Sequence, residues 1–267
     1  MKPGNLNIQV VPVSLDTMIW VFQMKKFLVI AILFYSVHFV LAQPTAGTSG
    51  LLNCPTADIY PDGTFSAGIN YLPDILTPQP EFNYNTFNYY LGMVFLPFME
   101  LSYRMTLLEN RSDEFKNQQD RSLALRVRII KEGKWVPSIV AGGNDILTTA
   151  PRHHTQHFIS YYIAATKTLQ SGKNIAKLSF GYAPEFFQDN YFTGFFGGIA
   201  FSPGLLRSLS INAEYDTQNF NAGLTLLLFR HIFLHAFAVN MEQIAGGIAF
   251  RLYPGGQRKK SPTFSYN

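Results

Sequence analysis

The stretch Ser210–Leu228, SINAEYDTQNFNAGLTLLL, contains two runs of alternating apolar and polar residues that are separated by a short turn. In the first run, apolar residues at every second position alternate with polar ones that include Glu214 and Asp216. The apolar alternation resumes at Phe220, directly after the turn. Strict alternation predicts two β-strands of a hairpin, each with one apolar and one polar face. Carboxylates on the polar face need water or partners there.

The composition of the whole chain limits the class of protein. Of the 267 residues, 47% are hydrophobic and only 14% are charged, whereas about a quarter of the residues of a soluble domain are charged. Outer-membrane barrels have a similar composition, with many apolar and few charged residues, because apolar and polar residues alternate along their strands. The chain has no basic stripe, so we expect no nucleic-acid partner. The single cysteine, Cys54, excludes an internal disulfide framework.

Short segments with a period of two recur along the chain, and no long segment with a helical period follows residue 43. Long and short connections alternate between the first of these segments, as residues 73–85 and 108–120 are long and 132–134 is a tight turn. Up-and-down outer-membrane barrels have long outer loops and short periplasmic turns. The sequence therefore predicts an all-β, up-and-down antiparallel transmembrane β-barrel of about 12 strands, with both termini in the periplasm. The expected strands are 63–72, 87–96, 98–107, 121–131, 135–143, 157–168, 175–182, 193–201, 208–216, 219–229, 231–240 and 243–253.

The N-terminal residues have the pattern of a targeting segment. Met24-Lys25-Lys26 precedes the apolar run FLVIAILFYSVHFVLA, residues 27–42. This pattern predicts a signal peptide over 1–42, with Met24 as the start and cleavage after Ala42, and a membrane anchor is the alternative. The remaining chain then divides into an N-terminal periplasmic segment, the barrel and a C-terminal periplasmic tail, which we expect at 43–62, 63–253 and 254–267.

The polar faces of the expected strands carry charged residues, which alternation directs away from lipid and into the barrel lumen. Four positive and three negative side chains form a nearly balanced set. Such a network can rigidify a narrow barrel or line a polar path through it. The expected lumen charges are Glu100, Arg104, Arg126, Arg128, Glu214, Asp216 and Arg251.

Several phrases of the sequence, taken in their order, resemble YjbH-type proteins. The phrases are GTSGLLNCPTADIYPDGTFSAGINYL at 47–72, VAGGNDILTT at 140–149, FTGFFGGIAFSP at 192–203 and NAEYDTQNFNAGLTLLL at 212–228. The resemblance covers nearly all of residues 47–253. It extends, without an assigned chemical role, to Asn144, Asp145, Glu214, Tyr215, Asp216, Asn221, Ala222 and Gly223.

The resemblance implies a β-barrel in the outer membrane of a Gram-negative bacterial cell, linked to exopolysaccharide production or export. We therefore expect a non-enzymatic protein without a cofactor that assists export or surface polysaccharide assembly. The expected partners are outer-membrane lipid, polysaccharide and export-machinery proteins. Arginine suits acidic sugars because its planar guanidinium binds carboxylates bidentately. The candidate residues for such contacts are Arg104, Arg126, Arg128 and Arg251, which Glu214 and Asp216 are expected to hold in place.

Three further classes of protein are compatible with the sequence. An outer-membrane hydrolase of the phospholipase kind would need a serine and a histidine on the outer wall, and Ser208, Ser210, His231 and His235 are the residues available near the late strands. A purely structural barrel or a soluble periplasmic β-sandwich would also account for alternating strands. We expect no metal site, and the weak candidates for one are the loop residues His153, His154 and His157.

Overall fold

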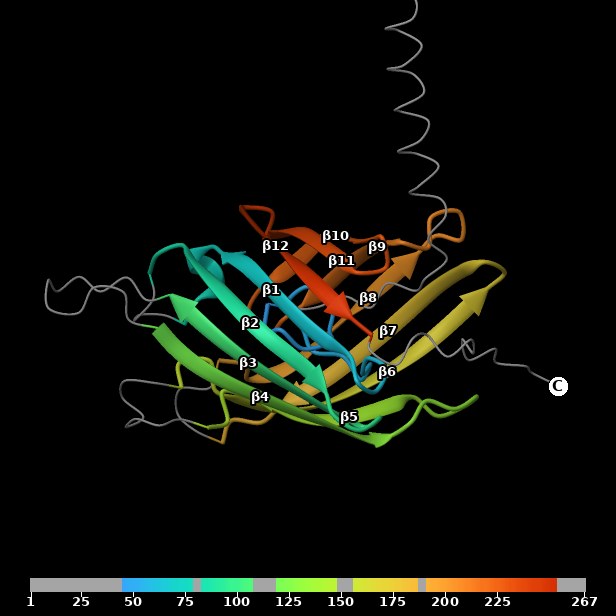
Figure 1. The fold of residues 1–267 in the computed structure, drawn as a ribbon, viewed down its shortest axis with the longest axis horizontal. Helices are drawn as coiled ribbons and strands as arrows, with labels where there is room; N and C mark the ends of the chain where they lie inside the picture. The colour runs from blue at the N-terminus through green and yellow to red at the C-terminus, as the bar shows by residue number, and fades with distance from the viewer. Residues whose placement is uncertain (1–44, 79–82, 108–118, 148–155, 187–190, 254–267) are drawn as a thin grey trace, which may run out of the picture.

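A computed structural model of the chain describes residues 45–78, 83–107, 119–147, 156–186 and 191–253. Twelve antiparallel strands form a closed barrel in which each strand pairs with the next and β12 pairs with β1 (Figure 1). This confirms the predicted fold class. Among the described residues, no helix is both long and apolar enough to cross a membrane. The strands are β1 (Phe65–Leu72), β2 (Thr86–Val94), β3 (Met99–Leu107), β4 (Gln119–Ile130), β5 (Ser138–Asn144), β6 (Ser160–Ser171), β7 (Asn174–Ala183), β8 (Gly194–Ser202), β9 (Leu209–Tyr215), β10 (Phe220–Leu228), β11 (Ile232–Val239) and β12 (Gln243–Leu252).

All twelve predicted strands are present, and all of their ends lie within three residues of the predicted positions. The clearest shift is in β6, which was expected at 157–168 and runs to Ser171. Ser171 pairs with Asn174, so Gly172 and Lys173 alone form the turn to β7. Gly172 has a φ of 59°, a conformation that two-residue hairpin turns require and that glycine adopts without strain.

The two faces of the wall differ as the alternation predicted. In the hairpin of β9 and β10, Glu214 is 4% exposed, whereas Ile211 and Leu224 on the other face are 48% and 50% exposed. The same contrast holds around the barrel, where large apolar side chains such as Phe180 and Ile248 form the outer surface. An outward apolar belt suits hydrocarbon, and the inward face keeps the carboxylates away from it.

This sidedness predicts the effect of a charge in the outer belt. Replacing Leu224, in the middle of β10, with arginine should lower the free energy of unfolding by about 2–4 kcal/mol, because the charge would lie in hydrocarbon. Urea unfolding in lipid vesicles measures the loss. The matched control is Ile244→Arg, since Ile244 is an outward residue at the start of β12, and there we expect a loss of about 0–1 kcal/mol. Equal losses at both positions would contradict a membrane-facing belt.

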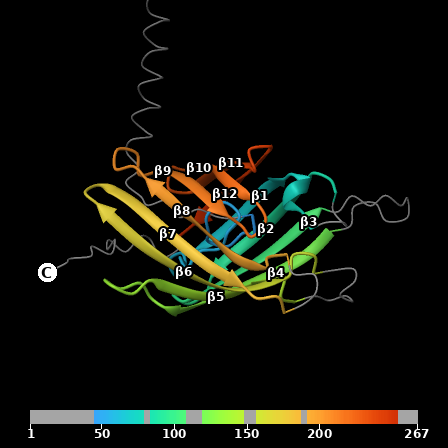
Figure 2. The same ribbon diagram turned by 180° about the vertical axis from the view of Figure 1, so that it is seen from behind.

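Residues 45–60, the plug, fill the barrel lumen. The segment is seen in blue between the strands in both views (Figures 1 and 2). Its side chains and main chain form hydrogen bonds to residues of β1 to β7 and of β9. The sequence placed 43–62 in the periplasm as a separate segment. Residues 45–60 of that segment lie inside the barrel instead, because the inward polar side chains bind their main chain, whereas Pro61 and Asp62 are exposed.

The plug extends from one end of the barrel to the other. The proximal rim is the end at which β1 begins and β12 ends, and the distal rim is the opposite end. At the proximal rim the guanidinium of Arg251 lies 4.1 Å from the ring centroid of Tyr60. Towards the distal rim, Leu52 packs with Leu76 of the 3₁₀ turn η1 (Asp74–Leu76) and with Val239 near the end of β11. The lumen is therefore occupied along its length.

Candidate functional site

The first anchor of the plug is an ion pair between two neighbouring strands. Arg126 of β4 and Glu100 of β3 face each other in the strand register, and their side chains lie 3.0 Å apart. Arg126 is fully buried and donates to the main-chain oxygens of Ser49, Thr56 and Asp58. Glu100 accepts from the main-chain N–H of Ser49 at 2.9 Å. Because the pair binds both arms of the plug, the first before Gly50 and the second after Pro55, it links the segment to the wall.

The second anchor is the carboxylate of Glu214. It accepts hydrogen bonds from three consecutive main-chain N–H groups, those of Leu52 at 2.9 Å, Asn53 at 2.6 Å and Cys54 at 3.2 Å. These groups belong to a turn that is closed by the bridge between Gly50 and Pro55. A carboxylate that accepts several main-chain N–H groups is held strongly, since each of these bonds is charge-assisted.

The family-like residues Asp216 and Asn221 complete this second anchor. Asn221 faces Glu214 across β9 and β10, and its Nδ2 lies 2.9 Å from oxygens of both Glu214 and Asp216. Asp216 also accepts from Nδ2 of Asn53 at 2.7 Å. The early phrase at 47–72 and the late phrase at 212–228 therefore form one structural unit, because the late strands bind the turn of the plug.

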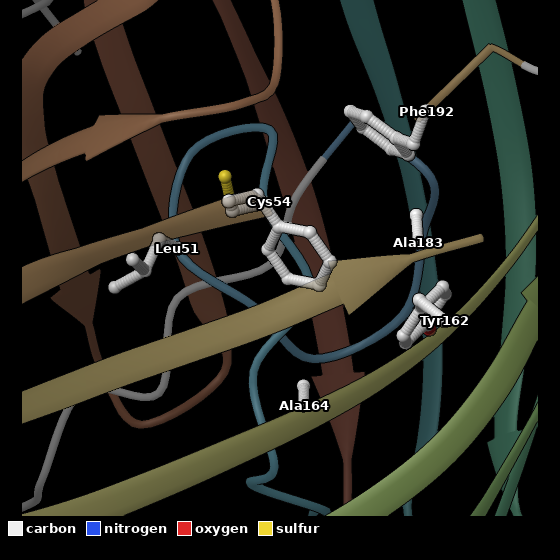
Figure 3. Close-up of a cluster of buried hydrophobic side chains, with 7 residues drawn as sticks. Leu51, Cys54, Tyr162, Ala164, Ala183 and Phe192 are labelled. Atoms are coloured by element: carbon white, nitrogen blue, oxygen red, sulfur yellow. The ribbon is translucent and has the colours of Figure 1, made fainter. Parts of the chain in front are cut away.

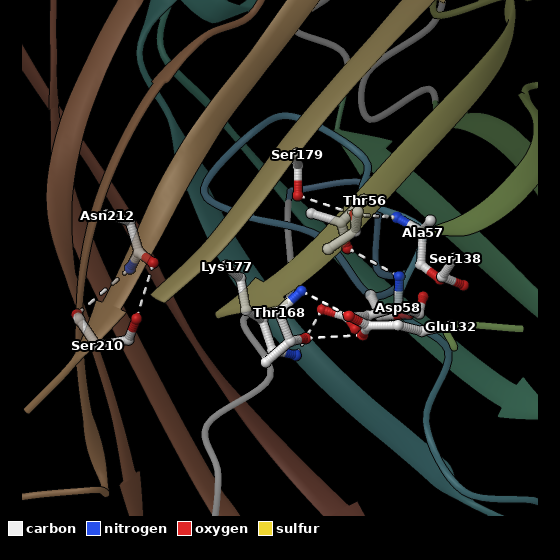
Figure 4. Close-up of polar contacts among 12 residues, drawn as sticks. Thr56, Ala57, Asp58, Glu132, Ser138, Thr168, Lys177, Ser179, Ser210 and Asn212 are labelled. Carbon is white, nitrogen blue, oxygen red and sulfur yellow. Dashed lines mark hydrogen bonds and ion pairs between the residues drawn. The ribbon is translucent and has the colours of Figure 1, made fainter. Parts of the chain in front are cut away.

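Side chains of β5, β6 and β7 hold the second arm of the plug (Figure 4). The N–H of Ala57 donates to Oγ1 of Thr166 at 2.8 Å, and the carbonyl of Ala57 accepts from Oγ of Ser138 at 2.9 Å. Asp58 forms an ion pair with Lys177 at 2.7 Å. These contacts were not predicted, because most of the plug atoms involved are main-chain atoms, which every residue has. The only sequence signal for these contacts is the alternation that directs Ser138, Thr166 and Lys177 into the lumen. It could have identified the wall residues but not their partners in the plug.

Apolar packing accompanies the hydrogen bonds at the turn of the plug. Leu51 and Cys54 belong to a buried cluster with Tyr162, Phe192 and Phe196 (Figure 3). Burial raises the pKa of the Cys54 thiol well above its ordinary value, and the charge of Glu214 raises it further. The thiol therefore stays protonated, which suits packing and not nucleophilic attack.

Six of the seven predicted lumen charges are buried, with exposures of 5% or less, and Arg128 is partly exposed near the proximal rim. The prediction that Glu214 and Asp216 hold the arginines is wrong. The two acids face the turn of the plug from β9, whereas the arginines have other partners. Arg251 lies against Tyr60 and Phe233, Arg104 lies 4.0 Å from the ring centroid of Phe158, and Arg128 donates to the carbonyl of Pro97.

The remaining family-like residues lie at the ends of β5 and β9 and in the middle of β10. Asn144 ends β5 and donates to Oγ of Ser160 at 3.2 Å. Tyr215 lies on the outer face, and its carbonyl accepts from the thiol of Cys54 at 3.2 Å. Gly223 contacts the main chain of β11 so closely that a Cβ atom would collide with Ala236. These residues shape the wall behind the second anchor and at the distal rim.

Asp145 follows β5 and carries a perturbed carboxyl group. Burial raises its pKa to about 7, the charge of Asp120 contributes, and the charge of Arg104 opposes the rise. Its Oδ2 accepts from the N–H of Phe158 at 3.2 Å. Because the folded pKa exceeds the unfolded one, this group destabilises the fold progressively as the pH rises from about 4 to about 7.

We expect Asp145→Asn to remove this pH dependence. At about pH 8 the variant should be more stable than the parent by up to about 4 kcal/mol, and at about pH 4 the two should be nearly equally stable. Urea unfolding at the two pH values measures the difference. A stability difference that is the same at both pH values would show that ionisation of Asp145 is not its cause.

Three of the four residues considered for hydrolysis are buried, whereas His231 is partly exposed in the turn before β11 and lies beside Phe250. Ser208, Ser210 and His235 are buried with exposures of 6% or less, and Oγ of Ser210 donates to Asn212 at 3.0 Å (Figure 4). Nδ1 of His231 lies 2.7 Å from the carbonyl of Arg251.

The described residues contain no group of three metal-ligating His, Cys, Asp or Glu side chains. Of the three histidines considered for a metal, His153 and His154 lie outside the described residues. The predicted signal peptide over 1–42 and the predicted tail at 254–267 lie outside them as well.

Comparison with known proteins identifies the family. The family model YjbH, described as "Exopolysaccharide biosynthesis protein YbjH", matches residues 42–226, which include the plug and both of its anchors. No curated protein matches the chain. Outer membrane phospholipase A from Escherichia coli is 12% identical with a TM-score of 0.38, over 73% of this chain and 94% of that chain. The outer membrane phospholipase (OMPLA) dimer with bound calcium from Salmonella typhi is 13% identical with a TM-score of 0.34, over 73% and 92%. Because the family model spans more than half of the sequence, the chain belongs to the YjbH family of exopolysaccharide biosynthesis proteins.

Proposed function

We propose that this chain is an outer-membrane β-barrel protein that assists exopolysaccharide export or surface polysaccharide assembly without catalysing a reaction. Family membership supports a polysaccharide-related role. The outward apolar belt supports a membrane location, since side chains such as Leu91 and Phe180 are 63% and 60% exposed and would face water in a soluble protein. The closed barrel has no open sheet edge, as a membrane-spanning sheet requires.

The occupied lumen is the observation that carries the assisting role. The Arg126–Glu100 pair and Glu214 hold the plug across the interior. A polymer chain has no free bore in this state of the barrel. The geometry therefore fits an accessory role in export better than the role of the main export channel.

The arginines of the lumen do not enter the proposal as glycan ligands. Arg126 directs its donors to the plug, and Arg104 and Arg251 lie against aromatic rings, with exposures of 5% and 1%. A polysaccharide would have to displace the plug to reach Arg126, whose donors bind the plug main chain, or Arg251, which lies against Tyr60 of the plug. We propose instead that polysaccharide and export-machinery proteins engage the barrel outside the lumen, and that lipid surrounds the wall.

Deletion of the gene in its host tests the proposal. Released and surface-bound polysaccharide should fall, with material retained inside the envelope, and expression of the intact chain should reverse both changes. The protein should stay in the membrane after a carbonate wash and should change its gel mobility on heating. Unchanged polysaccharide in the deletion strain would favour a purely structural barrel. Turnover of phospholipid by the purified protein in detergent would instead indicate a hydrolase.

A further inference from the structure

We propose a second activity, beyond the assisting role in polysaccharide export: the plug can leave the lumen, and its departure opens a water-filled path for small hydrophilic solutes. Two features of the structure lead to this inference. The wall is complete without the plug, and many of the wall residues that the plug covers are polar.

The hydrogen-bond ladder of the wall closes without any contribution from the plug. β1 pairs with β12 on one side, from Phe65 opposite Leu252 to Tyr71 opposite Gly246, and with β2 on the other. Within the described residues, the bridge assigned to the plug joins its own Gly50 and Pro55 and adds no strand to the wall. The plug can therefore leave without breaking the sheet, and no new sheet edge is exposed to lipid.

The hydrogen bonds that hold the plug are of a kind that water can replace, whereas the apolar packing of Leu51, Leu52 and Cys54 would be lost on its departure. Arg126, Glu214 and Thr166 bind its main-chain groups, and the freed N–H and C=O groups can bind water equally well outside the barrel. Many inward wall residues, such as Asn88 and Ser179, also carry a charged, amide or hydroxyl group. A vacated lumen lined in this way would fill with water and would not collapse on an apolar core.

The charge of this lining determines which solutes can pass. The described wall places equal numbers of positive and negative side chains around the plug or just beyond it. Neither sign dominates, so the open path should discriminate weakly between small cations and anions and should admit neutral hydrophilic molecules. The charged groups are Arg104, Arg126, Arg128, Lys177 and Arg251, and Glu100, Asp120, Asp145, Glu214 and Asp216.

Conductance across planar bilayers tests the proposal with potassium chloride as the probe. The full chain should be mostly closed, and a chain without residues 45–60 should conduct steadily, with a cation-to-anion permeability ratio near one. A synthetic peptide of the plug sequence, TAGTSGLLNCPTADIY, should close the shortened barrel again. A scrambled peptide of the same composition is the matched control and should leave it open.

A second pair of substitutions covers the case in which the shortened chain does not fold. Glu214→Gln with Asp216→Asn keeps the full chain and weakens the second anchor, so the frequency of open events should rise at least about tenfold. The proposal is overturned if a shortened barrel that keeps its heat-modifiable mobility does not conduct. It is also overturned if the double variant opens no more often than the parent. Both readouts are independent of polysaccharide, so the export role can fail without affecting them.

Discussion

Replacing Arg126 with methionine should lower the free energy of unfolding by about 3–5 kcal/mol. The substitution leaves Glu100, which is 2% exposed, as a buried carboxylate without its counter-charge, and such losses have this size. The main-chain oxygens of Ser49 and Thr56 lose their donor as well. Urea unfolding in detergent micelles measures the loss of stability. Limited proteolysis should show that cleavage within residues 45–60 begins before the barrel unfolds.

Arg128→Met is the matched control for this prediction. Arg128 lies one inward step further along β4, is partly exposed, and donates to the carbonyl of Pro97. Because solvent screens its charge, we expect a loss of at most about 1 kcal/mol and no early cleavage of the plug. Equal effects of the two substitutions would mean that the Arg126–Glu100 pair does not hold the segment.

Replacing Glu214 with alanine should release the turn of the plug. The N–H groups of Leu52, Asn53 and Cys54 lose their common acceptor, and Asn221 loses one of its two carboxylate partners. Each buried donor left without a partner costs about 1–3 kcal/mol, so the loss should total about 3–5 kcal/mol after the turn relaxes. Hydrogen exchange of the three amides should become at least about 100-fold faster, as a loss of about 2.7 kcal/mol already implies.

Two further variants test whether the loss depends on the negative charge of Glu214 and on its position at the turn of the plug. Glu214→Gln keeps an acceptor oxygen and should lose about half as much stability. Glu132→Ala removes a carboxylate that accepts from the N–H and the hydroxyl of Thr168 at 2.7 and 2.8 Å, outside the plug. That variant should leave the amides of Leu52, Asn53 and Cys54 protected. If protection of these amides survived Glu214→Ala, the second anchor would have been assigned to the wrong residue.

Much of the wall could be predicted from the sequence, because side-chain direction in a strand depends on local parity. The alternation in Ser210–Leu228 places Glu214 on the inner face and Leu224 on the outer face, as observed. The same rule yields all twelve strands and the burial of Arg104, Arg126 and Arg251. The ends of the strands were less certain, as β6 shows, since a two-residue turn at Gly172 extends the pairing beyond the polar residues that suggested a loop.

Only the tertiary structure decided where residues 45–60 lie and what the inward charges bind. The plug has no periodicity that could indicate its location, and it is short and irregular. Its contacts join residues that are far apart in the chain, such as Leu52 and Glu214, and they use main-chain N–H and C=O groups that no residue type identifies. Local sequence therefore determined which side chains point inward, whereas closure of the barrel around the segment determined that they hold a plug.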